Sequence, residues 1–376
     1  MLGAGLPESG LREYRRRRHG RRMDKVRLAI VGCGTISQLN APGYLEHPAC
    51  DVVALCDPVR ERAELRAAQW GIAPKIYTSY EEVLDDSSVD AVELLTPTYQ
   101  HPQQIVGALE AGKHVSCQKP VSTSVAEVET IAAAVARATT KFRVTENFLF
   151  YPPIVKAKEL LDAGVIGEPS MVRIRTVRAR LREGSGLVIE PDAYTWRRDP
   201  ESNAGGLLYD DGWHKFATAM WWIGDVDKVY AMVTKTDDFI VEAPSAIMWH
   251  FAGRNCLATF EYASASEMTI RGRYYPVDEF FEIQGSKGAI WVTRCTGEML
   301  DMPPVVIVKG TETTGVQVPM DWLEGFSGSA RHFIDCILKD EQPAMDVDFS
   351  RRVLQAALAL YRSAEQDRPI DPRSFS

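Results

Sequence analysis

Residues 26–37, VRLAIVGCGTIS, indicate the fold of the first part of this 376-residue chain. A largely apolar run ends in GCGTIS at 32–37, a GxGxxG-type turn with serine at its third small position, and a helical pattern follows. In such a turn the first glycine permits a tight bend, the second lets the backbone approach a pyrophosphate, and the third position needs only a small side chain. The amino end of the following helix would direct N–H groups at the phosphates. The stretch therefore predicts a strand–turn–helix unit that binds a dinucleotide, the alternative being a purely structural turn.

Short apolar runs alternate with helix-period segments up to about residue 147. The apolar runs lie at 26–31, 51–56, 91–95, 114–117 and 142–144, and the helical segments at 36–45, 60–70, 103–111 and 125–138. Repeated strand–helix alternation is typical of a parallel sheet with helices on both faces. We predict that residues 24–148 form a doubly wound parallel sheet of the Rossmann type.

The pattern changes after about residue 151. A helical segment at 154–163 is followed by two-residue alternation, for example at 172–176 and 258–262. Such alternation is typical of antiparallel strands with one solvated face. We predict that residues 149–376 form a second α/β domain around a large, mostly antiparallel open sheet, with the last helices packing back against the first domain.

Composition and charge exclude several classes of protein. Hydrophobic residues make up 45% of the chain and charged residues 25%, which is ordinary for a globular protein, and no stretch approaches the roughly 18 apolar residues of a membrane span. Seven arginines against two glutamates give residues 1–22 a net charge of +5, whereas the rest carries −13. An acidic body argues against nucleic acid as the main partner. We interpret Met23 as the natural start and residues 1–23 as a disordered or non-native extension, rather than a nucleic-acid arm or a transit peptide.

The number and spacing of the cysteines indicate the redox environment of the protein. There are seven, scattered, without a CxxC pair or a Cys/His ligand pattern. Reduced thiols in a cytoplasmic protein are the expectation.

An acidic residue ends the second predicted strand. Asp57 lies 25 residues after Gly32. An acid at this place accepts hydrogen bonds from the ribose hydroxyls of the adenosine and repels a 2′-phosphate. Asp57 therefore favours NAD over NADP, although Arg60 nearby would soften that preference.

Two further segments carry candidate catalytic residues. Lys119 follows the fourth predicted strand, at the end of the sheet where ligands bind, and could hydrogen-bond a substrate hydroxyl. If a helix runs from about Leu207, Asp210 and His214 share one face, and the carboxylate would orient the imidazole as a general base. The alternatives are a solvated lysine and a structural Asp–His pair; we predict no metal site, since no third ligand has a suggestive spacing.

Together these residues resemble the Gfo/Idh/MocA family, which includes glucose–fructose oxidoreductases and inositol dehydrogenases. The resemblance covers nearly everything after Met23. It rests on the motifs at 32–37, Asp57-Pro58, Thr96-Pro97 with His101, AGKHV at 111–115, Lys119-Pro120, Asp210 to His214, and the ending at 333–343.

The resemblance implies roles for particular residues. Lys119 matches the catalytic lysine of the family, Asp210 its acid and His214 its proton-transferring histidine. The cofactor residues would be Gly32, Gly34, Thr35, Ile36, Ser37, Asp57, Thr96, Pro97, His101, Gln118, Lys119 and Asn147. Two departures affect the substrate and the rate: Gln118 replaces the usual Glu before Lys-Pro, and NFLF at 147–150 lacks an arginine often found there.

The expected reaction is NAD-dependent oxidation of a ring hydroxyl of a sugar, glycoside or cyclitol. The alternatives are a keto-sugar reductase, a glycosidase that retains NAD, and a non-catalytic sugar-sensing regulator. Aromatic and guanidinium groups suit sugar rings, so the predicted substrate residues are Lys119, Tyr151, Trp196, Arg197, Asp199, Asp210, Trp213 and His214, with core packing the alternative for Trp196 and Trp213. The family often uses the open sheet for assembly, and we expect a homodimer or homotetramer.

Overall fold

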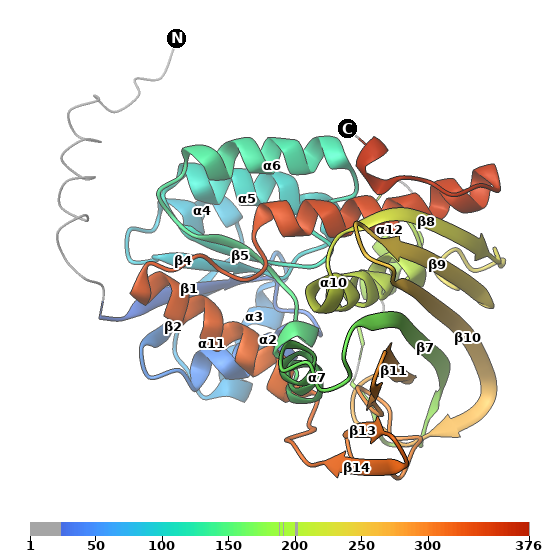
Figure 1. Ribbon diagram of the computed structural model, residues 1–376. Coiled ribbons are helices and arrows are strands. Elements are labelled where there is room, and N and C mark those ends of the chain that lie inside the picture. Colours follow the sequence, from blue (N-terminus) through green and yellow to red (C-terminus); the bar gives the residue numbers. More distant parts are fainter. Residues whose placement is uncertain (1–23, 188, 191, 200–201, 376) are drawn as a thin grey trace.

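The computed structural model describes residues 24–187, 189–190, 192–199 and 202–375. The extension predicted for residues 1–23 lies outside the described residues. Two sheets, each with its own helices, make up the described chain (Figure 1).

The first sheet is parallel throughout, in the order β3-β2-β1-β4-β5-β6. Its strands are β1 (Val26–Val31), β2 (Cys50–Cys56), β3 (Lys75–Tyr77), β4 (Ala91–Leu94), β5 (His114–Gln118) and β6 (Phe142–Thr145). Its helices are α2 (Ser37–Leu45), α3 (Arg60–Trp70), α4 (Tyr80–Asp85), α5 (His101–Glu110) and α6 (Val125–Arg137). Because β1 pairs with both β2 and β4, the strand order reverses there, which is where doubly wound sheets bind ligands. The predicted Rossmann-type sheet is confirmed.

The second sheet has the order β14-β13-β12-β11-β7-β10-β9-β8. Its strands are β7 (Pro169–Leu181), β8 (Val226–Val233), β9 (Ser245–Phe251), β10 (Leu257–Ile270), β11 (Val277–Gly285), β12 (Gly288–Val292), β13 (Val305–Lys309) and β14 (Glu312–Val316). Only the β7–β10 pair is parallel. This confirms the predicted large, mostly antiparallel sheet.

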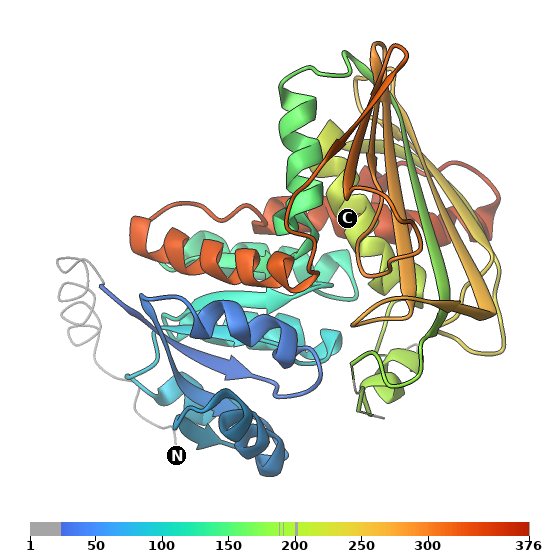
Figure 2. The same cartoon turned by 90° about the horizontal axis from the view of Figure 1, so that it is seen from below.

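Helices cover one face of the second sheet. They include α7 (Pro152–Asp162), α10 (Gly212–Ile223) and α12 (Val347–Gln366), and Figure 2 shows them on the side that faces the first domain. Short helices α8 (Asp192–Thr195) and α9 (Leu207–Asp210) precede α10. None of the described helices has the length and apolar character of a membrane span.

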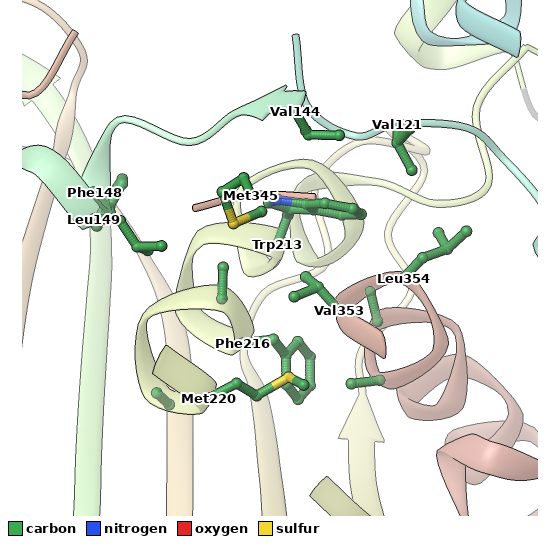
Figure 3. Close-up of a cluster of buried hydrophobic side chains, with 14 of the residues drawn as sticks. Val121, Val144, Phe148, Leu149, Trp213, Phe216, Met220, Met345, Val353 and Leu354 are labelled. Atoms are coloured by element: carbon green, nitrogen blue, oxygen red, sulfur yellow. The ribbon is translucent and has the colours of Figure 1, made fainter. Parts of the chain in front are cut away.

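The two domains share a hydrophobic core. Figure 3 shows side chains from β6, α10, α12 and the segment before α12 packed together, among them Val144, Trp213, Phe216, Met345, Val353 and Leu354. A backbone hydrogen bond of 2.9 Å from Val144 N to Met345 O joins the segment before α12 to β6. Trp213 is fully buried in this core. Its predicted contact with substrate is therefore wrong, because apolar packing between the domains takes up the whole indole.

The end of the chain returns to the first domain. Helix α11 (Leu323–Lys339) packs against α2 on the face opposite α5 and α6 (Figure 1). A Cβ on Gly43 would lie 2.6 Å from Ser327 Cα, so this close helix crossing requires glycine. All seven cysteines are buried thiols.

Candidate active site

A cavity of about 550 Å³ extends from the glycine turn of the first domain to the second sheet. Most of the predicted site residues line it: Gly32, Gly34, Thr35, Ile36, Asp57, Thr96, Pro97, Gln118, Lys119, Asn147, Trp196, Arg197, Asp210 and His214. Segments far apart in the sequence therefore meet in one space, as the carboxyl ends of parallel strands do.

The two glycines of the turn are required for different structural reasons. Gly32 has φ +94°, and a Cβ there would lie 2.7 Å from Leu95 O, so the backbones of β1 and β4 leave no room for a side chain. A Cβ on Gly34 would meet nothing within 4 Å, which leaves open space on the cavity side. Ser37 is buried and its hydroxyl donates to Gly34 O at 2.7 Å. Ser37 thus braces the turn and does not line the cavity.

Asp57 directly follows β2 and lies in the cavity wall. Its carboxylate accepts the backbone N–H groups of Cys33 and Val59, both at 2.9 Å. The sequence predicts that Arg60 softens the preference for NAD. In the structure Arg60 pairs with Glu64 at 3.5 Å, and the arginine that lines the cavity near Asp57 is Arg62.

Glu190 brings the second domain onto the same turn. Its carboxylate accepts from the Thr35 hydroxyl and from Arg66 Nη2 at 3.1 Å. A contact between the domains therefore forms part of the cavity wall on this side.

Besides Ser37 and Trp213, three further predicted residues are absent from the cavity lining. His101 is buried, with Nδ1 2.9 Å from Pro120 O and Nε2 2.8 Å from Thr96 O, so it ties together the loops after β4 and β5. Burial lowers the pKa of His101 to about 4. Tyr151 is buried and donates to Met320 O at 3.0 Å, and Asp199 accepts from the Ser202 hydroxyl at 2.5 Å. Burial and these hydrogen bonds leave His101 and Tyr151 no free polar atom for the predicted contacts with cofactor and substrate. Asp199 is half-buried, and its contact with substrate stays a prediction.

Two buried amides offer donors in the cavity wall. Among the described residues, Gln118 Nε2 and Asn147 Nδ2 have no hydrogen-bond partner. Buried polar groups are nearly always satisfied, so such donors indicate a ligand or water. With the open space at Gly34 and the N–H groups of the turn, this donor set fits the polar groups of a dinucleotide.

Lys119, Asp210 and Arg197 form one ionic cluster. Lys119 Nζ donates to Asp210 Oδ1 at 2.5 Å and to Asp210 O at 2.9 Å, and Arg197 Nε donates to Asp210 Oδ2 at 2.9 Å. Burial opposes ionisation of Asp210, but the two cations outweigh it and hold the pKa of this carboxyl well below its usual range. The carboxylate therefore holds the lysine in place at the end of β5.

The predicted Asp210–His214 pair is wrong. Asp210 ends α9, whereas His214 belongs to α10, and the Asp210 carboxylate is occupied by Lys119 and Arg197. The imidazole instead pairs with Glu146, whose Oε1 lies 2.6 Å from His214 Nδ1. Glu146 directly follows β6, so this pairing joins the two domains.

The surroundings keep His214 neutral. Its ring stacks on Phe148 with centroids 4.3 Å apart. Burial, together with the ammonium groups of Lys119 and Lys215, lowers the pKa of His214 well below its ordinary value. Burial raises the pKa of Glu146 to about 7, despite the opposing Phe148 N–H and Lys119.

A second buried cluster was not predicted from the sequence. Lys215 Nζ donates to Asp211 Oδ1 at 2.9 Å and to Glu279 Oε1 at 2.7 Å. Asp211 and Glu279 line the cavity. No sequence spacing relates Lys215 in α10 to Glu279 in β11, so the sequence pattern could not predict this cluster. Glu146, by contrast, follows a predicted strand at the ligand-binding end of the sheet and could have been found there.

A Rossmann-type sheet whose glycine turn shares a cavity with polar groups of a second α/β domain is typical of enzymes that bind a dinucleotide beside a small-molecule substrate. Residues 26–146 match the model of the oxidoreductase family with an NAD-binding Rossmann fold, and residues 154–291 match the GFO/IDH/MocA C-terminal domain. The chain belongs to the Gfo/Idh/MocA family and is an NAD(P)-dependent oxidoreductase.

Known proteins similar to this chain include both a dehydrogenase and a reductase. It is 25% identical to D-apiose dehydrogenase from Paraburkholderia graminis over 92% of this chain and 90% of that protein. It is 28% identical to dTDP-3,4-didehydro-2,6-dideoxy-alpha-D-glucose 3-reductase from Actinomadura kijaniata, over 85% of this chain and 89% of that protein. An oxidoreductase from Agrobacterium radiobacter, solved with NAD+, L-tartaric acid and magnesium, has the same fold, with a TM-score of 0.79, 18% identity, and coverage of 94% of this chain and 100% of that one.

Proposed function

We propose that the protein oxidises a ring hydroxyl of a sugar, glycoside or cyclitol, with NAD as the hydride acceptor. The observation that carries the proposal is that one cavity is lined by the glycine turn and by Lys119, Asp210 and His214. The relative named D-apiose dehydrogenase supports a sugar as substrate.

The first domain supplies the groups that would hold NAD. The turn at Gly34 offers backbone N–H groups and open space, and the amides of Gln118 and Asn147 offer unpaired donors. Asp57 supports NAD over NADP, because a carboxylate disfavours a 2′-phosphate. When bound, the nicotinamide ring accepts the hydride.

Lys119, Asp210 and His214 divide the remaining work. The ammonium of Lys119 would donate a hydrogen bond to the substrate oxygen and stabilise the charge that develops on it. The ionised Asp210 holds this ammonium at 2.5 Å, which replaces the role beside the imidazole expected from the sequence. His214 is neutral and lines the cavity, so it can accept the hydroxyl proton as a general base.

Aromatic groups beside the ionic cluster suit a sugar ring. Trp196 lines the cavity, and the Arg197 guanidinium lies 4.2 Å from its ring centroid. Tyr275 and Trp322 line the same cavity. Apolar surfaces with a few directional hydrogen-bonding groups are characteristic of small-molecule sites.

The screen that tests the function follows NADH absorbance over free sugars, glycosides, inositols and sugar acids. We expect NADH release with at least one neutral polyol or sugar. Turnover without NADH release would favour the glycosidase that retains NAD. Because one relative is a reductase, keto-sugars with NADH are assayed in parallel; a lack of turnover in both directions would refute the proposal.

Assembly is proposed through the helix-free face of the second sheet. Met232, Met248 and Leu257 are exposed by 68%, 46% and 40%. Exposed apolar side chains clustered on a sheet favour self-association. We expect a dimer or tetramer by light scattering at micromolar concentration; a monomeric mass would contradict this.

A further inference from the structure

Glu146 is an unusual carboxylate for the interior of a protein. It is fully buried. Its Oε1 accepts the Phe148 N–H at 3.0 Å and lies 2.6 Å from His214 Nδ1, while Oε2 has no partner among the described residues. Burying a carboxylate with so few partners is costly, and a buried group of this kind beside a cavity is a candidate for a functional role.

His214 lines the cavity, and Glu146 lies behind it in the protein interior. The Phe148 ring stacks on the imidazole, and Nδ1 is directed at Glu146, so Nε2 is the nitrogen left for a ligand in the cavity. The charged groups that act on the pair are Lys119 at the end of β5, with Lys215 and Asp211 around the start of α10.

We propose that Glu146 is a positioning residue: it holds His214 with the proton on Nδ1, and takes up that proton when Nε2 accepts the proton of the substrate hydroxyl. This inference rests on the proposed function, because it needs a substrate hydroxyl at Nε2. It assigns the part expected of Asp210 to a residue 68 positions upstream of the histidine.

The proposed transfer balances. The substrate O–H bond breaks and an Nε2–H bond forms, while the Nδ1–H bond breaks and an O–H bond forms on Glu146. The substrate carbon loses a hydride, with its electron pair, to the nicotinamide. One proton is then released to solvent from the pair, which matches the single proton released in oxidising an alcohol with NAD.

The pH dependence has a definite sign. Burial raises the pKa of Glu146 to about 7 and lowers the pKa of His214 well below its ordinary value. The pKa of the carboxyl is therefore the higher of the two, and an added proton resides on Glu146. A protonated Glu146 donates to Nδ1 and leaves a proton on Nε2, which then cannot act as a base. Oxidation should therefore rise with pH through about 7 and reduction should show the opposite trend.

The kinetic test is Glu146→Gln, with Glu93→Gln as a matched control. Glu93 is also fully buried in the first domain, where it accepts from the Tyr44 and Thr145 hydroxyls. We expect Glu146→Gln to lower kcat for oxidation by about 100-fold or more, with KM changed by less than about threefold. The rise of the oxidation rate with pH near 7, the limb of the pH profile, should be lost. Glu93→Gln should keep the limb. An unchanged limb in Glu146→Gln would overturn the proposal.

A spectroscopic test needs no substrate and so separates this inference from the proposed function. Histidine ¹⁵N shifts report the tautomer, and His214→Gln assigns the resonance among the seven histidines. In the wild-type protein with NAD we expect the Nδ1–H tautomer at pH 8.5 and the neutral Nε2–H tautomer at pH 5.5, with a midpoint near 7. A single tautomer across this range, or a charged imidazole at pH 5.5, would overturn the proposal even if Glu146→Gln did not fold.

Discussion

Asp210→Asn tests the ionic cluster with the least change in shape. Asp210 accepts from Lys119 at 2.5 Å and from Arg197 at 2.9 Å, one cation on each oxygen. The amide replaces one oxygen by a donor, so one of the two cations loses its acceptor. A hydrogen bond to a charged group contributes about 1.5–3 kcal/mol, which corresponds to a loss of roughly 10- to 150-fold in kcat/KM.

The assay is initial-rate NADH formation with the best substrate from the screen. Most of the loss should be in kcat, since Lys119 acts on the charge that develops during hydride transfer. The rise in rate near pH 7 should persist, because the pKa of Asp210 lies well below this range. Activity within about threefold of the wild type would refute the view that Asp210 holds the lysine in place.

Three other changes test separate parts of the account. Asp57→Asn should lower the ratio of kcat/KM for NAD over NADP by about tenfold, equivalent to about 1.4 kcal/mol; equal kcat/KM values with NAD and with NADP in the wild type would contradict the assignment. Trp213→Ala should cost about 3–5 kcal/mol in the free energy of unfolding, measured in urea, since the indole is fully buried; a change below 1 kcal/mol would contradict its place in the core. Because burial raises the pKa of Glu146 from 4.5 to about 7, stability from this group is present below about pH 4.5 and lost as pH rises through 7. The Tm of Glu146→Gln relative to wild type should therefore increase from pH 5 to 8.5, and a constant difference would contradict the shift.

The fold was predictable because its signals are local. Strand–helix alternation and the glycine turn at 32–37 specify the parallel sheet, and two-residue alternation specifies the antiparallel one. The placement of candidate cofactor residues at strand ends was also predictable, since parallel strands bring their carboxyl ends to one edge. Gly34 and Asp57 lie in the cavity wall for this reason.

The catalytic pairing was less predictable because it depends on contacts between domains. A spacing of four residues places Asp210 and His214 on one face only if one helix continues through both, and the structure has two helices there. The imidazole then pairs with Glu146, across the domain junction. Likewise, sequence neighbourhood put Trp213 near substrate, whereas packing against α12 buries it in the core.

The central claim is that Lys119 and His214 carry out hydride-transfer chemistry on a hydroxyl in this cavity. The most direct measurement compares NADH formation by the wild type, Lys119→Ala and His214→Ala, with NAD binding measured on each. We predict that both variants still bind NAD, while kcat falls by about 10² to 10⁴ for His214→Ala and at least as much for Lys119→Ala. Near-normal turnover in both variants would contradict the account.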